Sequence, residues 1–314
     1  MRRRPAAGAR RLALGIPLAG LVLAGTAGVA FAQKPDTARL HRTLDSLAAA
    51  HHGVVGYAVR DVDTGARLSL RGDSTFPTAS LIKVAVLVTL YDLVEKGQIS
   101  LDDPLTLLAI DKVGGSGVLA NLQPGLTITV RDAAQLMIEL SDNTATNLLL
   151  QKVTIGRVAA RMDSLHLANT RVHHQVMLRA ITSVARDSSE KYGLGKTTPN
   201  EMSQLFALMA LGRADGPRPD SAMLAMLETN DDHELLVRWL SGIRAAHKTG
   251  ADDDVRTECA LFYLRTRVVA CVFTNRNADQ RWIVDNEPER LMGRMGAEIA
   301  RAFGPVAPGK VETP

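Results

Sequence analysis

A dense run of apolar residues organises the chain. From Leu81 to Leu90 every residue except Lys83 and Thr89 is apolar, and the run closes at Gly97. A helix that is apolar on nearly every face is expected to lie in the interior of a domain. Pro77 keeps the preceding segment from being helical throughout, so the helix is expected to begin near Ser80.

Strands are predicted near both ends of the chain, and helices are predicted between them. The strand signals are short β-branched or alternating apolar segments bounded by turn residues. They cover residues 53–61, 66–71, 245–249, 257–264 and 268–274.

This order predicts an α/β lobe built from both ends of the chain and an all-α lobe inserted between them. The α/β lobe takes residues 33–78 and 245–314, and the all-α lobe takes residues 79–244. A ligand site is expected where the two lobes meet. The pattern also predicts a long surface loop over residues 168–196 and a helix over residues 233–240.

The first 32 residues have the pattern of an export signal. Five arginines precede an apolar stretch, and Ala30-Phe31-Ala32 forms a small-residue cleavage site. We therefore expect residues 1–32 to be a signal peptide and residues 33–314 the mature domain. The protein would then be exported, periplasmic or secreted, without stable membrane insertion. An uncleaved membrane anchor is the alternative.

Removing this leader changes the charge. The chain has 37 Lys and Arg against 33 Asp and Glu, and the leader holds five of the basic residues. The mature chain therefore has 32 basic and 33 acidic side chains, and no nucleic-acid partner is expected. We expect a monomer. Cys259 and Cys271 lie on consecutive predicted strands, and either a disulfide or two packed thiols fits the sequence.

Ser80 and Lys83 are the first candidates for chemistry. Three residues apart at a helix start, they project from one face. A hydroxyl beside an amine in a dry pocket forms a nucleophile and a base, because burial lowers the pKa of lysine. The alternative is a serine cap followed by a surface lysine. No metal or cofactor is expected, since the adjacent pairs His51-His52 and His173-His174 lack ligand spacing.

Two further motifs follow in chain order, Ser141-Asp142-Asn143 between two apolar helices and Lys248-Thr249-Gly250 at a strand end. By itself, the first could also be an ordinary turn between two helices, with Asp and Asn as capping groups. Ser-x-x-Lys, Ser-Asp-Asn and Lys-Thr-Gly in this order are typical of class A β-lactamases and penicillin-binding proteins. The chain therefore resembles the class A β-lactamase-like serine hydrolases over its whole mature length. The resemblance implies an antiparallel sheet flanked by helices, with the active site between the lobes.

The resemblance also implies roles for the matching residues. Ser80 would attack a β-lactam or a D-Ala-D-Ala-like peptide, and Lys83 would take its proton or organise the group that does. Ser141 would pass a proton to the leaving nitrogen. The chain would thus act on small molecules through a covalent acyl-enzyme.

The remaining matches would bind substrate. Asn143 would hold the side-chain amide, and Lys248 with Thr249 would bind the carboxylate. Gly250 would let the substrate approach the strand closely. The backbone N–H groups of Ser80 and Ala251 would form the oxyanion hole. Arg256 is a weaker match, and it is expected at the surface.

One departure from the family pattern concerns deacylation. Class A enzymes use a loop glutamate in a Glu-x-x-Leu-Asn pattern, but residues 173–180 here contain no glutamate and no Leu-Asn. Glu190 is the nearest candidate, and it is expected to be solvated. Three functions stay open: an exported serine β-lactamase, a DD-peptidase or esterase of the penicillin-binding type, and a slowly deacylating β-lactam binder.

Overall fold

The computed structural model describes residues 35–304 and 309–312. The predicted signal peptide, residues 1–32, lies outside these ranges. Within the described residues, no helix combines the length and the apolar character that crossing a bilayer requires.

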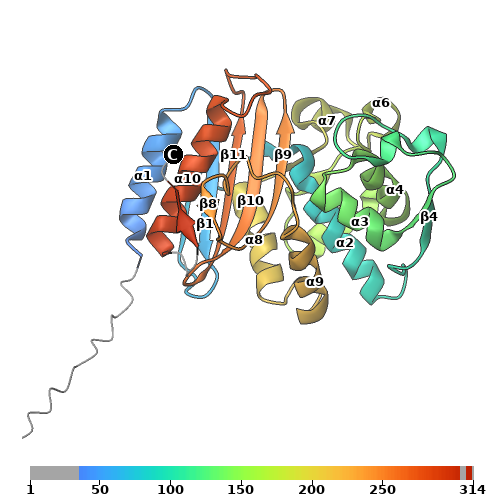
Figure 1. Cartoon of the computed structure of the whole chain (residues 1–314), viewed down its shortest axis with the longest axis horizontal. Coiled ribbons are helices and arrows are strands. Elements are labelled where there is room, and N and C mark those ends of the chain that lie inside the picture. The colour runs from blue at the N-terminus through green and yellow to red at the C-terminus, as the bar shows by residue number, and fades with distance from the viewer. Residues whose placement is uncertain (1–34, 305–308, 313–314) are drawn as a thin grey trace, which may run out of the picture. The chain divides into compact units, whose positions relative to one another are not determined.

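A five-stranded antiparallel sheet forms the centre of the fold (Figure 1). Its strands come from both ends of the described chain and run in the order β2-β1-β11-β10-β9. The edge strand β9 faces the large group of helices in Figure 1. The strands are β1 (Val54–Asp61), β2 (Arg67–Leu70), β9 (Ala245–Asp252), β10 (Val255–Tyr263) and β11 (Arg267–Asn275).

The first and last helices, α1 (Thr37–Ala49) and α10 (Glu287–Phe303), cover one face of the sheet (Figure 1). Asp36 caps α1 by accepting a hydrogen bond from the backbone N–H of Arg39 at 2.9 Å. Leu40 and Leu44 lie on the apolar face of α1, and both are buried in the core. The predicted packing of helix on sheet is confirmed.

Helices from the middle of the chain pack on the other face and beyond the β9 edge. The apolar helix α2 (Lys83–Glu95) is buried along almost its whole length. Helix α8 (Pro199–Ala210) packs against β1 and β11, although it belongs to the predicted all-α insertion. The other helices are α3 (Val130–Glu139), α4 (Asn143–Val153), α5 (Ile155–Ser164), α6 (Arg179–Thr182), α7 (Arg186–Tyr192) and α9 (Pro217–Leu227).

Short elements join these parts. The 3-10 helices are η1 (Ala79–Ile82), η2 (Ala109–Asp111) and η3 (Leu119–Asn121). The short strands are β3 (Phe76–Pro77), β4 (Pro104–Thr106), β5 (Thr127–Thr129), β6 (Arg171–Val172), β7 (Gly195–Thr197), β8 (Leu240–Ser241) and β12 (Lys310–Val311).

Two sequence predictions are wrong in detail. Residues 168–196 are not one surface loop, because they contain β6, α6, α7 and β7. Residues 233–240 are not a helix. The buried Glu258 carboxylate accepts the backbone N–H of Leu236 at 2.5 Å and hydrogen-bonds His247 Nδ1 at 2.7 Å. These tertiary contacts override the local helical pattern.

The structure also decides the state of the two cysteines. Cys259 on β10 and Cys271 on β11 are cross-strand partners and are joined by a disulfide. Both side chains are buried on the face of the sheet that packs against the central helices.

The core beneath α1 gives a stability prediction. Leu44→Ala leaves a cavity in a fully buried site and is expected to lower the free energy of unfolding by about 2–5 kcal/mol. Leu47→Ala on the same helix is the matched control, since Leu47 is only half-buried. Urea denaturation of both variants measures the difference. Equal losses would contradict this placement of the core.

Candidate active site

Ser80 lies in η1, directly before the buried helix α2. It is half-buried, and the residue before it, Ala79, has a positive φ of 44°. Such a conformation costs a non-glycine residue energy and is common at functional sites. The turn is held from outside, because Thr257 Oγ1 on β10 donates to the carbonyl of Thr78 at 2.8 Å.

Lys83 occupies the first position of α2, one turn after Ser80. Its side chain is fully buried, with an exposed fraction of 0%. Its Nζ donates to the Ser141 carbonyl at 2.6 Å and to Asn143 Oδ1 at 2.9 Å, and it shares a hydrogen bond of 3.1 Å with the Ser141 hydroxyl. Burial, together with repulsion from Lys248, holds the pKa of Lys83 well below its usual value. A neutral lysine that contacts a serine hydroxyl can accept a proton.

Ser141 and Asn143 reach the site from the connection between α3 and α4. Ser141 has a positive φ of 53°, which turns the chain sharply between the two helices. Asn143 also donates through Nδ2 to the carbonyl of Gly114 at 3.0 Å. Lys83 and Asn143 together therefore link three segments: helix α2, the α3–α4 connection and the loop around Gly114.

Asp142, the middle residue of the motif, is the helix cap that the sequence offered as an alternative, and it also holds a distant loop that the sequence did not predict. Its Oδ1 caps α4 at the N–H of Ala145 (2.8 Å), and its Oδ2 accepts the N–H groups of Val118 and Leu119 at 2.7 and 2.9 Å. A Cβ on Gly117 would meet this carboxylate at 2.2 Å, so only glycine fits there. The motif itself contained this residue, but its partners lie far away in sequence.

Lys248, Thr249, Gly250 and Ala251 lie on the edge strand β9. Lys248 is fully buried, and burial lowers its pKa to about 8. A Cβ on Gly250 would meet the carbonyl oxygen of Thr78 at 2.4 Å and the nitrogen of Leu81 at 2.7 Å. Gly250 is therefore needed for close packing of β9 on the Ser80 turn, rather than only for approach of a substrate.

A pocket of about 310 Å³ opens beside Ser80. It brings together five of the predicted residues, while Lys83, Asn143 and Lys248 are buried close to it. Several residues of the pocket wall were not predicted from the sequence. The adjacent acidic residues Asp231 and Asp232 were the sequence feature that could have pointed to this wall. The lining residues are Ser80, Ser116, Glu139, Leu140, Ser141, Asn230, Asp231, Asp232, Thr249, Gly250, Ala251 and Trp282.

Comparison with known proteins agrees with this geometry. Residues 39–303 match the family described as the beta-lactamase enzyme family. The chain belongs to this family. It is 30% identical over 234 residues to a beta-lactamase of Streptomyces fradiae, covering 73% of this chain and 70% of that protein. As a member of the β-lactamase and penicillin-binding superfamily of serine hydrolases, it is an enzyme.

Solved structures show the same fold. A beta-lactamase from Sphaerobacter thermophilus superposes with a TM-score of 0.75 at 28% identity, covering 87% of this chain and 100% of that one. A variant of PBP-A, solved as an acyl-enzyme complex with penicillin G, has a TM-score of 0.74 at 24% identity and covers 85% and 96%. These similarities confirm the predicted antiparallel sheet flanked by helices.

In this β-lactamase-family chain, the segment in which the family pattern places the deacylation glutamate contains no glutamate. Asn147 on α4 clamps Val176 at both backbone groups, accepting its N–H at 2.8 Å and donating to its carbonyl at 3.0 Å. Glu190 lies exposed on α7 and is not among the described residues that line the pocket. The identity of a deacylation base stays a prediction.

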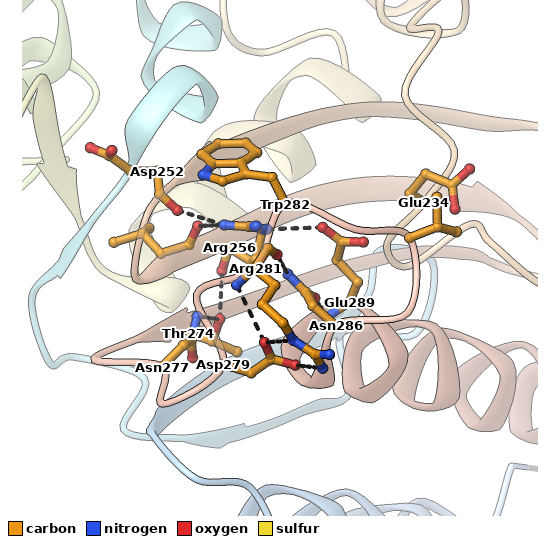
Figure 2. A network of polar contacts seen from close by, with 12 residues as sticks. Glu234, Asp252, Arg256, Thr274, Asn277, Asp279, Arg281, Trp282, Asn286 and Glu289 are labelled. Carbon is orange, nitrogen blue, oxygen red and sulfur yellow. Dashed lines mark hydrogen bonds and ion pairs between the residues drawn. The ribbon is translucent and has the colours of Figure 1, made fainter.

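The expectation that Arg256 lies at the surface is wrong. Arg256 is 1% exposed, and Figure 2 shows its guanidinium beneath the ring of Trp282, 4.6 Å from the ring centre. Its Nε pairs with Glu289 at 3.0 Å, and its Nη1 donates to the carbonyl of Asp252 at 2.5 Å. The paired carboxylate and the aromatic face make its burial possible.

The packing at Gly250 gives an activity prediction. Gly250→Ala must push β9 away from the Ser80 turn, and a shift of about 1 Å can lower catalysis roughly a hundredfold. We expect acylation of Ser80 to slow by that order, as measured by mass spectrometry. Gly156→Ala is the control, because a Cβ there meets nothing within 4 Å. Equal rates in the two variants would contradict the role assigned to Gly250.

Lys248 predicts a pH dependence. Its ammonium form would hold a substrate carboxylate, and burial lowers its pKa to about 8. The charge is therefore present below pH 8 and is lost as the pH rises through it, so KM for benzylpenicillin should rise on the alkaline side. Lys248→Arg keeps its charge and should abolish this rise. A KM in the wild-type protein that stays flat across this range would count against the assignment.

Proposed function

We propose that the protein is an exported serine β-lactamase-type hydrolase that opens β-lactams through an acyl-enzyme on Ser80. One observation carries the proposal: the buried Lys83 Nζ, which contacts both Ser141 Oγ and Asn143 Oδ1, lies one turn from Ser80 at the pocket. Burial lowers its pKa, which favours the neutral amine that a base requires.

Acylation then follows from the arrangement. Ser80 Oγ attacks the lactam carbonyl while its proton passes to the neutral Lys83 Nζ. The C–N bond breaks, and the leaving nitrogen takes the proton of Ser141 Oγ, which Lys83 restores through their 3.1 Å contact. Lys248 and Thr249 bind the substrate carboxylate. The product of this half-reaction is an ester of Ser80.

Deacylation is proposed to be slow. Water must attack the ester, and no acid occurs in the sequence from 171 to 180 to activate it. Val176, clamped by Asn147, has an apolar side chain, and the histidines of this segment, His173 and His174, are not among the described residues that line the pocket. Export by the leader and action as a monomer complete the proposal, on the sequence grounds given above.

The test is intact-protein mass spectrometry of the mature chain mixed with benzylpenicillin over seconds to hours. We expect a penicilloyl adduct on the wild-type protein that persists for many minutes, and none on Ser80→Ala. Glu190→Gln should leave the adduct lifetime unchanged, because Glu190 is exposed on α7. An absent wild-type adduct would refute the role of Ser80 with β-lactams.

A peptidase of the penicillin-binding type is the second candidate. The lack of an acid in residues 171–180 and the fold shared with PBP-A favour it. Release of D-Ala from a model D-Ala-D-Ala peptide, with a persistent penicilloyl adduct, would support this function over a β-lactamase. Rapid consumption of penicillin without peptide cleavage would support the β-lactamase.

A further inference from the structure

The charged side chains on the wall of the active-site pocket all have one sign. Among the described residues that line it, Glu139, Asp231 and Asp232 are acidic, and none is lysine, arginine or histidine. Asp252 and Asp253 extend this charge at the rim, since both are exposed and directly follow Ala251 on β9. The open volume beside Ser80 therefore faces negative charge.

The three acidic residues of the wall form no salt bridge within the described part of the chain. Only Asp232 among them interacts with a nearby cation, the buried Lys248. Glu139 accepts a hydrogen bond from Gln135 Nε2 at 2.8 Å, and Asp232 accepts the backbone N–H of Glu234 at 3.2 Å. Neutral donors leave the net charge in place, and a cleft lined by one sign of charge concentrates the opposite ion.

These acidic residues lie near Ser141, which protonates the leaving nitrogen in the proposed mechanism. Glu139 precedes Ser141 by two residues, and its carbonyl accepts the N–H of Asp231 at 3.1 Å. Burial lowers the pKa of Lys248, and the nearby carboxylate of Asp232 raises it again in part. The leaving half of a substrate therefore meets one buried ammonium beside three carboxylates.

Trp282 adds an aromatic surface to the same wall. Its side chain is 63% exposed and lines the pocket. Figure 2 shows the ring lying over Arg256, and its Nε1 donates to Asp253 Oδ1 at 3.1 Å. Aromatic faces and carboxylates both attract cations, so the Trp282 ring and the acids favour the same kind of ligand.

We propose that this pocket selects substrates whose leaving half carries a cationic group in addition to the carboxylate that Lys248 binds. The inference rests on the proposed function, because it concerns the same site. The substrate class is zwitterionic: a cephalosporin with a quaternary nitrogen next to its ring carboxylate, or a peptide with an ammonium group near its terminal carboxylate.

Cephaloridine and cephalothin form a matched pair of probes. They share the acyl side chain and the ring carboxylate, but cephaloridine carries a pyridinium where cephalothin carries a neutral acetoxy group. The measurement gives the rate of Ser80 acylation by cephaloridine divided by the rate with cephalothin. This ratio is then divided by the same ratio for hydrolysis of the two compounds by hydroxide. We expect a preference of about fivefold for cephaloridine at low salt, which shrinks at high salt as exposed charges are screened.

Neutralising the wall tests the cause. Glu139→Gln combined with Asp231→Asn should reduce the preference to near one. Asp102→Asn, whose carboxylate is 81% exposed and lies outside the pocket lining, should retain it. A wild-type ratio equal to the hydroxide ratio, or a double variant that keeps the preference, would overturn the inference. If the double variant does not fold, the salt dependence of the wild-type ratio decides.

The two proposals fail differently. If neither cephalosporin acylates Ser80, the proposed function fails and the inference fails with it. If both acylate Ser80 without a charge preference, only the inference fails.

Discussion

The site depends on a buried lysine whose hydrogen bonds are all accepted by residues from elsewhere in the chain. Lys83 is fully buried, and its Nζ contacts two oxygens of Ser141 and one of Asn143. Taking an ammonium out of water is costly, so burial shifts this lysine towards its neutral form. The contacts that bury it therefore favour the neutral amine that its proposed role as a base requires, and they also join α2 to the α3–α4 connection.

The second constraint is the close approach of the sheet edge to the Ser80 turn. Gly250 on β9 leaves no room for a Cβ against Thr78, and Thr257 on β10 holds the Thr78 carbonyl. Ser80, the proposed nucleophile, is thus carried by η1 but positioned by the sheet. Strands from the C-terminal part of the chain therefore hold the turn near residue 80 in place.

Charge around the pocket divides the site into two regions. Ser80 and Ser141, which act in acylation under the proposed function, both line the pocket, and Lys83 contacts Ser141. The acidic residues that line the pocket, Glu139, Asp231 and Asp232, lie near Ser141. Residues 171–180, in contrast, contain no acidic residue that could activate water. A slow second half-reaction and a preference for cations in the leaving half would follow from this one distribution of acids.

The sequence by itself determined the family, the five strands of the central sheet and the three motifs. These depend on local signals: an apolar run after Ser80, small polar residues between helices, and Lys-Thr-Gly at a strand end. Tertiary structure alone decided which distant groups meet. It buried Arg256 under Trp282 and against Glu289, and it formed the disulfide.

Tertiary contacts also replaced the helix predicted over residues 233–240 with a segment tied to Glu258. They placed Glu139, Asp231 and Asp232 on one pocket wall. The spacing of apolar residues along a segment indicates which of its own side chains share a face. It carries no information on partners that are far away in sequence, and those partners determine burial, pKa and the charge that a substrate meets.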